Sequence, residues 1–193
     1  MNTETENTAN ETEENRLIAE RRAKLDELRQ AGQAYPNDFR KNSISSDLHT
    51  RFCDIPAEEL EQVEDAFSVA GRIMAKRVMG KLAFVRLQDR GGSIQLMLQR
   101  DKLPEGVFQS FKRWDVGDIV GASGRIVRTQ KGELSIRANE LKLLSKSLRP
   151  LPEKYHGLTD TEVRYRQSYV DLIMSEESRG VFRTRSKIIT FVR

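Results

Sequence analysis

Phe84 and Gln95 have side chains suited to holding an unpaired nucleobase. Each falls on the polar face of a predicted strand, because the neighbours that alternate with them are apolar: Val85 and Leu87 follow Phe84, and Leu96 follows Gln95. An aromatic ring offers a base a stacking surface, and a carboxamide can both donate and accept a hydrogen bond at the edge of a base. The pair therefore predicts a site for single-stranded nucleic acid.

The competing interpretation places Phe84 in the hydrophobic core, where a strand phenylalanine usually lies. A register shift of one residue would turn its side chain inward. An exposed glutamine such as Gln95 is also commonplace on a strand. Because Val85 and Leu87 already fill the opposite face, we favour the outward orientation and expect loss of the ring to weaken binding by about 1 to 3 kcal/mol.

Glu133 is the third candidate, since a carboxylate stands out in a basic groove. It repels phosphate, so it either pairs with an arginine or accepts a hydrogen bond from a base and adds specificity. The cations expected around the site come from the loops before the second and the last strand: Lys76, Arg77, Lys81 and Lys131.

Five strands and one short helix must position these residues. The first strand begins at Phe67, with a bulge or bend at Gly71, and a basic loop at 76–81 follows it. The second and third strands are predicted at 83–89 and 93–98, joined by a turn at 90–92, and the helix at 104–113. The fourth strand is predicted at 118–128 and the fifth from Glu133 onwards, with Ser135 and Arg137 facing out. This is the order of an OB-fold barrel, which binds oligonucleotides on the face of strands two and three.

The expected fold class is therefore α+β, a five-stranded OB-fold β-barrel at 66–147 preceded by a helical extension at 15–65. Residues 1–14 contain no basic residue and one small apolar side chain, which predicts a disordered acidic tail. A helix is expected from Asn15, with apolar residues at helical spacing. Its opposite face is either merely solvated or supplies auxiliary RNA contacts from Arg21, Arg22 and Lys24.

The charge is divided unevenly along the chain. Residues 1–65 carry 8 Lys and Arg against 16 Asp and Glu, residues 66–147 carry 16 against 7, and residues 148–193 carry 9 against 6. The local net charge of +9 at 66–147 suggests a polyanionic partner, although charge alone also fits an ordinary solvated surface. The lone Cys53, the acidic N-terminus and the lack of a long apolar run predict a cytoplasmic protein without membrane association.

No catalytic or metal-binding constellation emerges from the sequence. We find no Ser/His/Asp set, no phosphate loop of Walker type and no ligand cluster around the isolated His49 and His156. We therefore expect no catalytic residue, metal or cofactor site in this chain.

Five long stretches carry a family resemblance: RRAKLDELRQAGQAYPNDF, VAGRIMAKRVMGKLAFVRLQD, WDVGDIVGASG, TQKGELSI and RPLPEKYHGLTDTEVRYRQSYVDL. They resemble the class II lysyl-tRNA synthetases of bacterial type, over nearly the whole chain after the acidic tail. The resemblance implies that the barrel binds a tRNA anticodon, with Phe84, Gln95 and Glu133 at its bases and Arg77 as a basic contact. It also implies that the preceding helix lies beside the anticodon stem.

Residues 148–193 resemble the linker and the start of the catalytic domain, and FRTRSKIITFVR is similar to the beginning of motif 1, the family's dimer-forming helix. Motifs 2 and 3, which in the family hold ATP, lysine and magnesium, have no counterpart in the sequence. The resemblance thus implies a homodimeric parent enzyme that uses ATP and magnesium to attach lysine to its tRNA. It implies a truncated chain that binds RNA without charging it.

An alternative is a stand-alone OB-fold module, either a single-strand binder or a tRNA-binding accessory protein without ligase activity. Such a module binds in a salt-dependent way with little base preference. The apolar residues of the last stretch argue against it, because a complete module has no need of them: Ile188, Ile189, Phe191 and Val192. A second alternative keeps the family but changes the amino acid to aspartate or asparagine. The helical extension and KYHGL resemble the lysine branch more closely.

Overall fold

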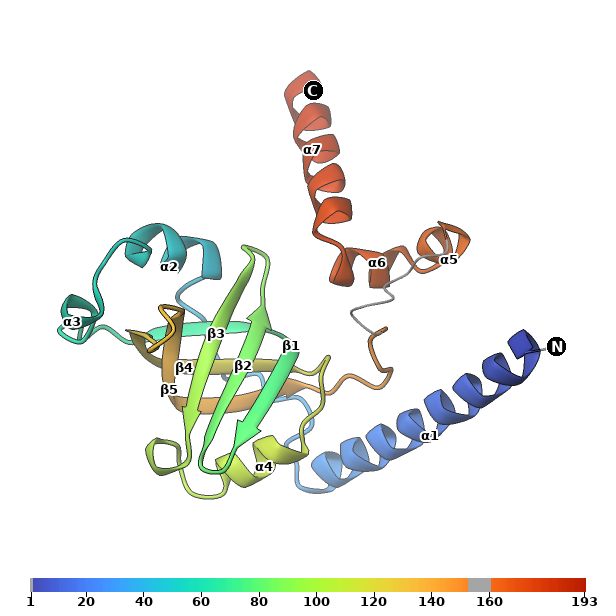
Figure 1. Ribbon diagram of the computed structural model, residues 1–193, viewed down its shortest axis with the longest axis horizontal. Helices are drawn as coiled ribbons and strands as arrows, with labels where there is room; N and C mark the ends of the chain where they lie inside the picture. Colours follow the sequence, from blue (N-terminus) through green and yellow to red (C-terminus); the bar gives the residue numbers. More distant parts are fainter. Residues whose placement is uncertain (1, 153–160) are drawn as a thin grey trace. The chain divides into compact units, whose positions relative to one another are not determined.

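The structure is a computed structural model that describes residues 2–152 and 161–193. The chain forms two compact units, Met1–Pro150 and Leu151–Arg193. The first unit contains a small β-barrel with helices before it, and the second contains helices (Figure 1).

The elements of the first unit are α1 (Asn2–Gln30), α2 (Ser45–Phe52), α3 (Ala57–Leu60), β1 (Phe67–Met79), β2 (Leu82–Gln88), β3 (Ser93–Gln99), the 3-10 turn η1 (Arg100–Lys102), α4 (Val107–Arg113), β4 (Ile119–Arg128) and β5 (Leu134–Ser145). Those described in the second unit are α5 (Thr161–Arg166), α6 (Ser168–Met174) and α7 (Glu176–Val192).

The five strands close into a barrel in the order β1-β2-β3-β5-β4. β3 and β5 are parallel, and the other neighbouring strands are antiparallel. The interior is filled by side chains with no exposed surface, among them Val69, Leu96 and Ile136. Figure 1 shows α4 at the end of the barrel where β1 ends, and its Phe111 is fully buried in the same core. The predicted OB-fold order of three strands, a helix and two strands is confirmed.

β1 is longer than predicted, and most of the expected basic loop 76–81 belongs to it. The β1–β2 ladder continues to Met79 opposite Leu82, so that only Gly80 and Lys81 remain for the turn. Gly80 has φ of +61°, a conformation that glycine adopts without a steric cost. Lys76 and Arg77 are therefore held on β1, whereas Lys81 lies in the turn.

Gly71 allows β1 and β2 to approach closely, and the bulge predicted at this glycine lies further along β1. A Cβ atom at Gly71 would lie 2.4 Å from the carbonyl oxygen of Gln88 on β2. The register shift of the β1–β2 ladder falls between Ile73 and Ala75. Glycine is needed at position 71 because any side chain would force these strands apart.

The N-terminal helix α1 begins at Asn2, earlier than the helix predicted from Asn15, and it includes residues 2–14 of the segment predicted as a disordered tail. Glutamate and alanine, which recur in this sequence, are good helix formers. The helix ends at Gln30, two residues before Gly32, which has φ of +69°.

The segment between α1 and β1 packs against the barrel. Phe52 of α2 lies edge-on to Phe67 of β1, with ring centroids 5.3 Å apart, and Leu60 of α3 is fully buried. The guanidinium of Arg128 donates to the backbone carbonyl oxygens of Phe52, Cys53 and Ile55. α2 is thereby fixed to β4 at its C-terminal end.

In the second unit, the side chain of Asp171 accepts hydrogen bonds from Ser178 and Arg164, which lower the pKa of its carboxyl below the ordinary value. α7 leaves large apolar side chains exposed, including Phe182 and Ile188. The predicted linker residues 153–160 lie outside the described residues. Within the described parts of both units, no helix is both long and apolar enough to cross a membrane.

Candidate nucleic-acid interface

Phe84 and Gln95 lie on the outer face of the barrel, as their alternation predicts. On β2, Val85 and Leu87 are each 1% exposed, whereas Phe84 is partly exposed. On β3, Leu96 is fully buried and Gln95 is partly exposed. The predicted register is therefore confirmed, and the two candidate side chains are accessible from outside the barrel.

Strand register extends Phe84 into a row across four strands. Phe84 pairs with Arg77 of β1 on one side and with Met97 of β3 on the other, and Met97 pairs with Arg137 of β5. We call these four residues the Phe84 row. An arginine at each end of an aromatic ring and a thioether offers phosphate neutralisation beside a stacking surface. Arg137 and Met97 were not candidates, although their outward alternation was visible in the sequence.

Gln95 is oriented by a chain of hydrogen bonds. Its Nε2 donates to Ser135 Oγ at 3.0 Å, and Ser135 Oγ donates to the backbone carbonyl oxygen of Glu133 at 3.2 Å. Because the hydroxyl proton is used on Glu133, Ser135 accepts from the amide nitrogen. The carboxamide oxygen of Gln95 then has no hydrogen-bond partner among the described residues and is available as an acceptor.

Ser135 itself departs from its predicted exposure. It is 0% exposed, although alternation from Glu133 predicted an outward position. The hydroxyl is tolerated there because both of its hydrogen bonds are satisfied within the barrel wall. The residue therefore supports the surface and does not form part of it.

Glu133 lies exposed in the turn before β5. Its backbone amide donates to Thr129 Oγ1, and its carbonyl oxygen accepts from the backbone amide of Thr129. Among the described residues, no ion pair or hydrogen bond involves its carboxylate. Lys131 is exposed in the same turn. Of the two roles considered from the sequence, pairing with an arginine is not what this structure shows.

Lys76 is used inside the protein. Its Nζ donates to the backbone carbonyl oxygens of Lys112 at 2.9 Å and Trp114 at 2.5 Å, at the C-terminal end of α4, and lies 5.2 Å from the centre of the Phe111 ring. Burial lowers the pKa of its ammonium group below the ordinary value. The lysine therefore caps α4 and holds it to β1, because cations satisfy the free carbonyls of a helix end.

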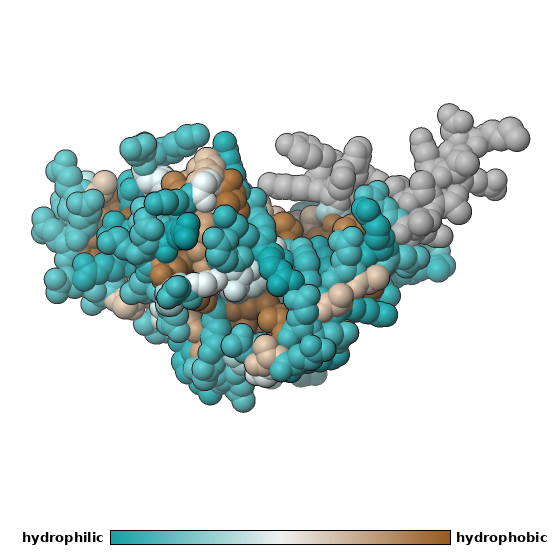
Figure 2. Space-filling model, turned by 90° about the horizontal axis from the view of Figure 1, so that it is seen from below, coloured by the Kyte–Doolittle hydropathy of each residue, from teal (hydrophilic) through white to brown (hydrophobic). Residues whose placement is uncertain are grey.

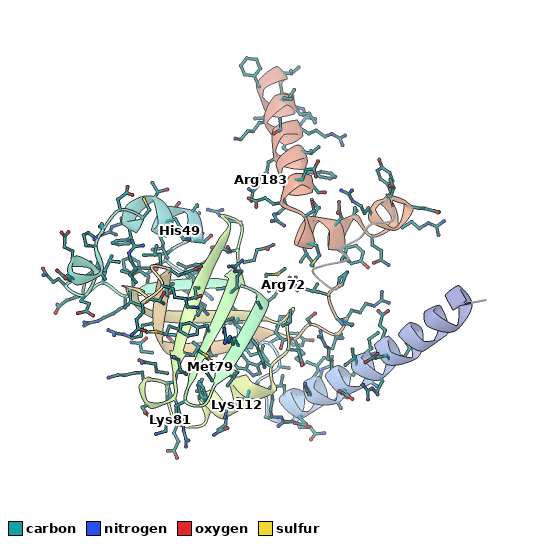
Figure 3. The ribbon with its side chains drawn as sticks, in the orientation of Figure 1. His49, Arg72, Met79, Lys81, Lys112 and Arg183 are labelled. Carbon is teal, nitrogen blue, oxygen red and sulfur yellow. The ribbon has the colours of Figure 1, made fainter. Side chains whose placement is uncertain are left out.

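Arg21 and Lys24 of α1 are likewise engaged within the first unit. Arg21 is 9% exposed and donates to the carbonyl oxygens of Ser147 and Arg149. Lys24 Nζ lies 2.9 Å from Asp115 Oδ1. These contacts fasten α1 to the barrel. Three other predicted auxiliary cations have exposed side chains instead: Arg22, Lys81 and Lys131. Figure 3 shows Lys81 beside Met79 at the β1–β2 turn, at the same end of the barrel as Lys112.

A buried ionic cluster beside α1 was not foreseen. Lys146 Nζ lies 2.8 Å from Asp118 Oδ1 and 2.5 Å from Asp115 Oδ2, and the Lys146 and Asp118 side chains are 2% and 0% exposed. Burial acts to raise the pKa of Asp115, but hydrogen bonds from Lys146 and Lys24 outweigh it, so this pKa lies below its ordinary value. The cluster joins α1, the loop before β4 and the end of β5.

The surface around these elements is mainly hydrophilic. On the face seen from the side on which α4 lies in Figure 1, hydrophilic residues predominate among the coloured residues, and apolar residues appear between them (Figure 2). An accessible aromatic ring flanked by cations on such a surface is typical of a site that stacks bases and attracts phosphates.

Comparison with known proteins identifies first the class of domain. Residues 67–144 match the family described as OB-fold nucleic acid binding domain, whose model is named for the tRNA anticodon. The match falls on the barrel that carries the Phe84 row.

The wider chain is similar to lysine–tRNA ligases. It is 57% identical over 181 residues to the lysine–tRNA ligase of Thioalkalivibrio sulfidiphilus, covering 94% of this chain and 36% of that protein. It is 52% identical over 186 residues to that of Psychromonas ingrahamii (96% and 36%) and 55% identical over 180 residues to that of Salmonella arizonae (93% and 36%). The chain is therefore homologous to part of the lysine–tRNA ligases and spans 36% of the length of these relatives.

Proposed function

We propose that this chain is the anticodon-recognition part of a lysine–tRNA ligase. The observation that carries the proposal is the Phe84 row, a partly exposed aromatic ring between two arginines on the outer face of β2 and β3. OB folds bind oligonucleotides on this face. The match of residues 67–144 to an OB-fold nucleic acid binding domain supports nucleic-acid binding by the barrel.

Recognition proceeds by stacking and edge contacts. One anticodon base stacks on Phe84, and Arg77 neutralises phosphate beside it. Gln95 accepts a hydrogen bond from a base through its carboxamide oxygen, since its amide nitrogen is held by Ser135. The exposed carboxylate of Glu133 accepts from a further base N–H. Lys81, Lys131 and Arg22 add electrostatic attraction, whereas Lys76, Arg21 and Lys24 act by holding helices to the barrel.

The parent reaction in this proposal is the ATP-dependent attachment of lysine to its tRNA, by a cytoplasmic enzyme that dimerises through a helix containing α7. The relatives named above are lysine–tRNA ligases. Within the described residues, no group of three or more His, Cys, Asp or Glu side chains could hold a metal ion. We infer that this chain by itself binds tRNA without aminoacylating it, which a lysine-charging assay on the isolated chain tests.

The binding test uses anticodon stem–loops of a lysine tRNA labelled with a fluorophore. Anisotropy titrations compare the native loop with loops in which the anticodon bases are changed, for wild type and Phe84→Ala. We expect a preference for the native loop and a loss of about 1 to 3 kcal/mol in Phe84→Ala. Tyr35→Ala is the matched control, because Tyr35 is 58% exposed and lies outside the barrel strands.

Equal affinity for all loops would refute anticodon recognition. It would favour the alternative of a base-tolerant module that binds single strands mainly through phosphates. If Phe84→Ala binds the native loop as tightly as wild type, the Phe84 ring does not contribute to RNA binding, whether or not the chain prefers the native loop.

A further inference from the structure

A cationic hollow lies on the barrel wall next to the Phe84 row. It has a volume of about 310 Å³ and is lined by five residues: Lys102 of η1, Arg125 of β4, and Arg137, Ala138 and Asn139 of β5. We call it the Arg125 hollow. Three of its lining side chains are cations and none is a carboxylate. The charge of this lining favours an anion.

Among the described residues, the three cations of the Arg125 hollow make no ion pair. Arg125 and Arg137 are direct cross-strand partners on β4 and β5, an arrangement in which like charges repel. No hydrogen bond or ion pair joins the side chain of Lys102, Arg125 or Arg137 to another described residue. By contrast, Lys142 is paired with Asp38 and Arg113 with Glu27 elsewhere on the same unit. An anion in the hollow would relieve the repulsion between these cations.

The position of the Arg125 hollow relates it to the proposed base site. Arg137 belongs to both, since it ends the Phe84 row and lines the hollow. Phe84 on β2 and Arg137 on β5 are separated by two strand spacings, so their backbones lie about 10 Å apart. That span matches the step from a stacked base to a backbone phosphate nearby on the same strand. A nucleotide chain crossing the row therefore brings a phosphate to the hollow.

We propose that the Arg125 hollow is a phosphodiester site for the RNA strand whose base stacks on Phe84. Arg125 and Arg137 each offer paired N–H donors to phosphate oxygens, Lys102 supplies a further positive charge, and Asn139 adds an amide donor. The inference rests on the proposed function, because it needs RNA on the Phe84 row. It adds a contact that positions the strand without reading its sequence.

The test combines protein variants with RNA that lacks one backbone charge. Arg125→Gln and Lys102→Gln are chosen because neither residue belongs to the Phe84 row. Lys41→Gln is the control, with the same loss of charge from an exposed lysine outside the barrel strands. Stem–loops carry a single uncharged methylphosphonate at each loop linkage in turn. Thermal melts of each variant confirm that it is folded.

We expect Arg125→Gln to weaken binding of the native loop about ten-fold, equally for every anticodon sequence, and to flatten the slope of log affinity against log salt by about 0.7. For wild type, one methylphosphonate linkage should cause a similar loss. In Arg125→Gln, that same linkage should cause no further loss. Lys102→Gln should follow the same pattern, and Lys41→Gln should bind like wild type.

The inference is overturned if every linkage costs Arg125→Gln as much as it costs wild type, because the arginine then contacts no particular phosphate. It is also overturned if Arg125→Gln and Lys102→Gln bind like Lys41→Gln. If Phe84→Ala loses affinity in that case, the proposed function stands without the hollow. If wild type fails to prefer the native loop, the proposed function fails as well.

Discussion

Removing the hydroxyl of Ser135 should reduce base discrimination by Gln95 without removing any atom from the RNA-binding surface. Ser135 is fully buried and joins Gln95 Nε2 to the carbonyl oxygen of Glu133. In Ser135→Ala, the carboxamide of Gln95 loses its anchor and rotates freely. Its nitrogen and oxygen can then both face a base, so that donor and acceptor edges are accepted alike.

The magnitudes follow from the hydrogen bonds lost. Each contributes about 0.5 to 1.5 kcal/mol. After the substitution the Gln95 amide can turn to water, because the residue is partly exposed, and the carbonyl of Glu133 keeps the backbone amide of Thr129. We therefore expect a stability loss near the lower end, about 1 kcal/mol. A similar loss of preorganisation corresponds to about a five-fold smaller preference for the native anticodon.

The assay is the same anisotropy titration on native and base-altered stem–loops, with urea unfolding for stability. Ser123→Ala is the control, since it breaks a side-chain hydrogen bond of similar length, 2.9 Å to Ser68 Oγ, on β4 and β1. It should lose stability and keep full discrimination. If Ser135→Ala is destabilised as expected but discriminates as well as wild type, Ser135 does not orient Gln95 for base reading.

Three further predictions concern stability. Lys76→Met should lower the free energy of unfolding, measured in urea, by about 1 to 2 kcal/mol, because α4 loses its capping cation. Its RNA affinity, measured by anisotropy, should stay near that of wild type. The pKa of Asp115 is lowered in the folded state. Its stabilising contribution is therefore present above the unfolded pKa and is lost as the pH falls through the folded pKa. In Asp115→Asn, the free energy of unfolding should fall less steeply between about pH 5 and 2, as measured by unfolding curves at each pH. Gly71→Ala should lower the melting temperature by several degrees, because its Cβ would meet the Gln88 carbonyl at 2.4 Å; a melting temperature equal to that of wild type would contradict this reading.

The barrel and its outward face could be predicted from local pattern. Alternation over β2 and β3 is strict, so the inward apolar residues fixed the register and thereby the outward positions of Phe84 and Gln95. The extent of β1 could not be predicted this way, because cations such as Arg77 look like loop residues until the pairing with β2 is known. The start of helix α1 could not be predicted, because a polar, acidic segment is typical of disorder and glutamate-rich segments also form helices.

The roles of individual cations depended on partners distant in the chain. Arg21 donates to the carbonyl oxygen of Ser147, 126 positions away, and Lys76 to carbonyls at the end of α4. Neither partner leaves a signal in the sequence around the cation, since any backbone carbonyl can accept. Arg125 and Arg137 became visible as a pair only through the β4–β5 register.

Cross-linking tests the central claim most directly, namely that the anticodon lies on the Phe84 row. A lysine tRNA stem–loop with a single photoreactive base in its anticodon is irradiated in complex with the chain, and the attached peptides are identified by mass spectrometry. The account predicts attachment within β2 and β3, at or beside Phe84 and Met97. Attachment only to α1, or only to residues 161–193, would contradict it.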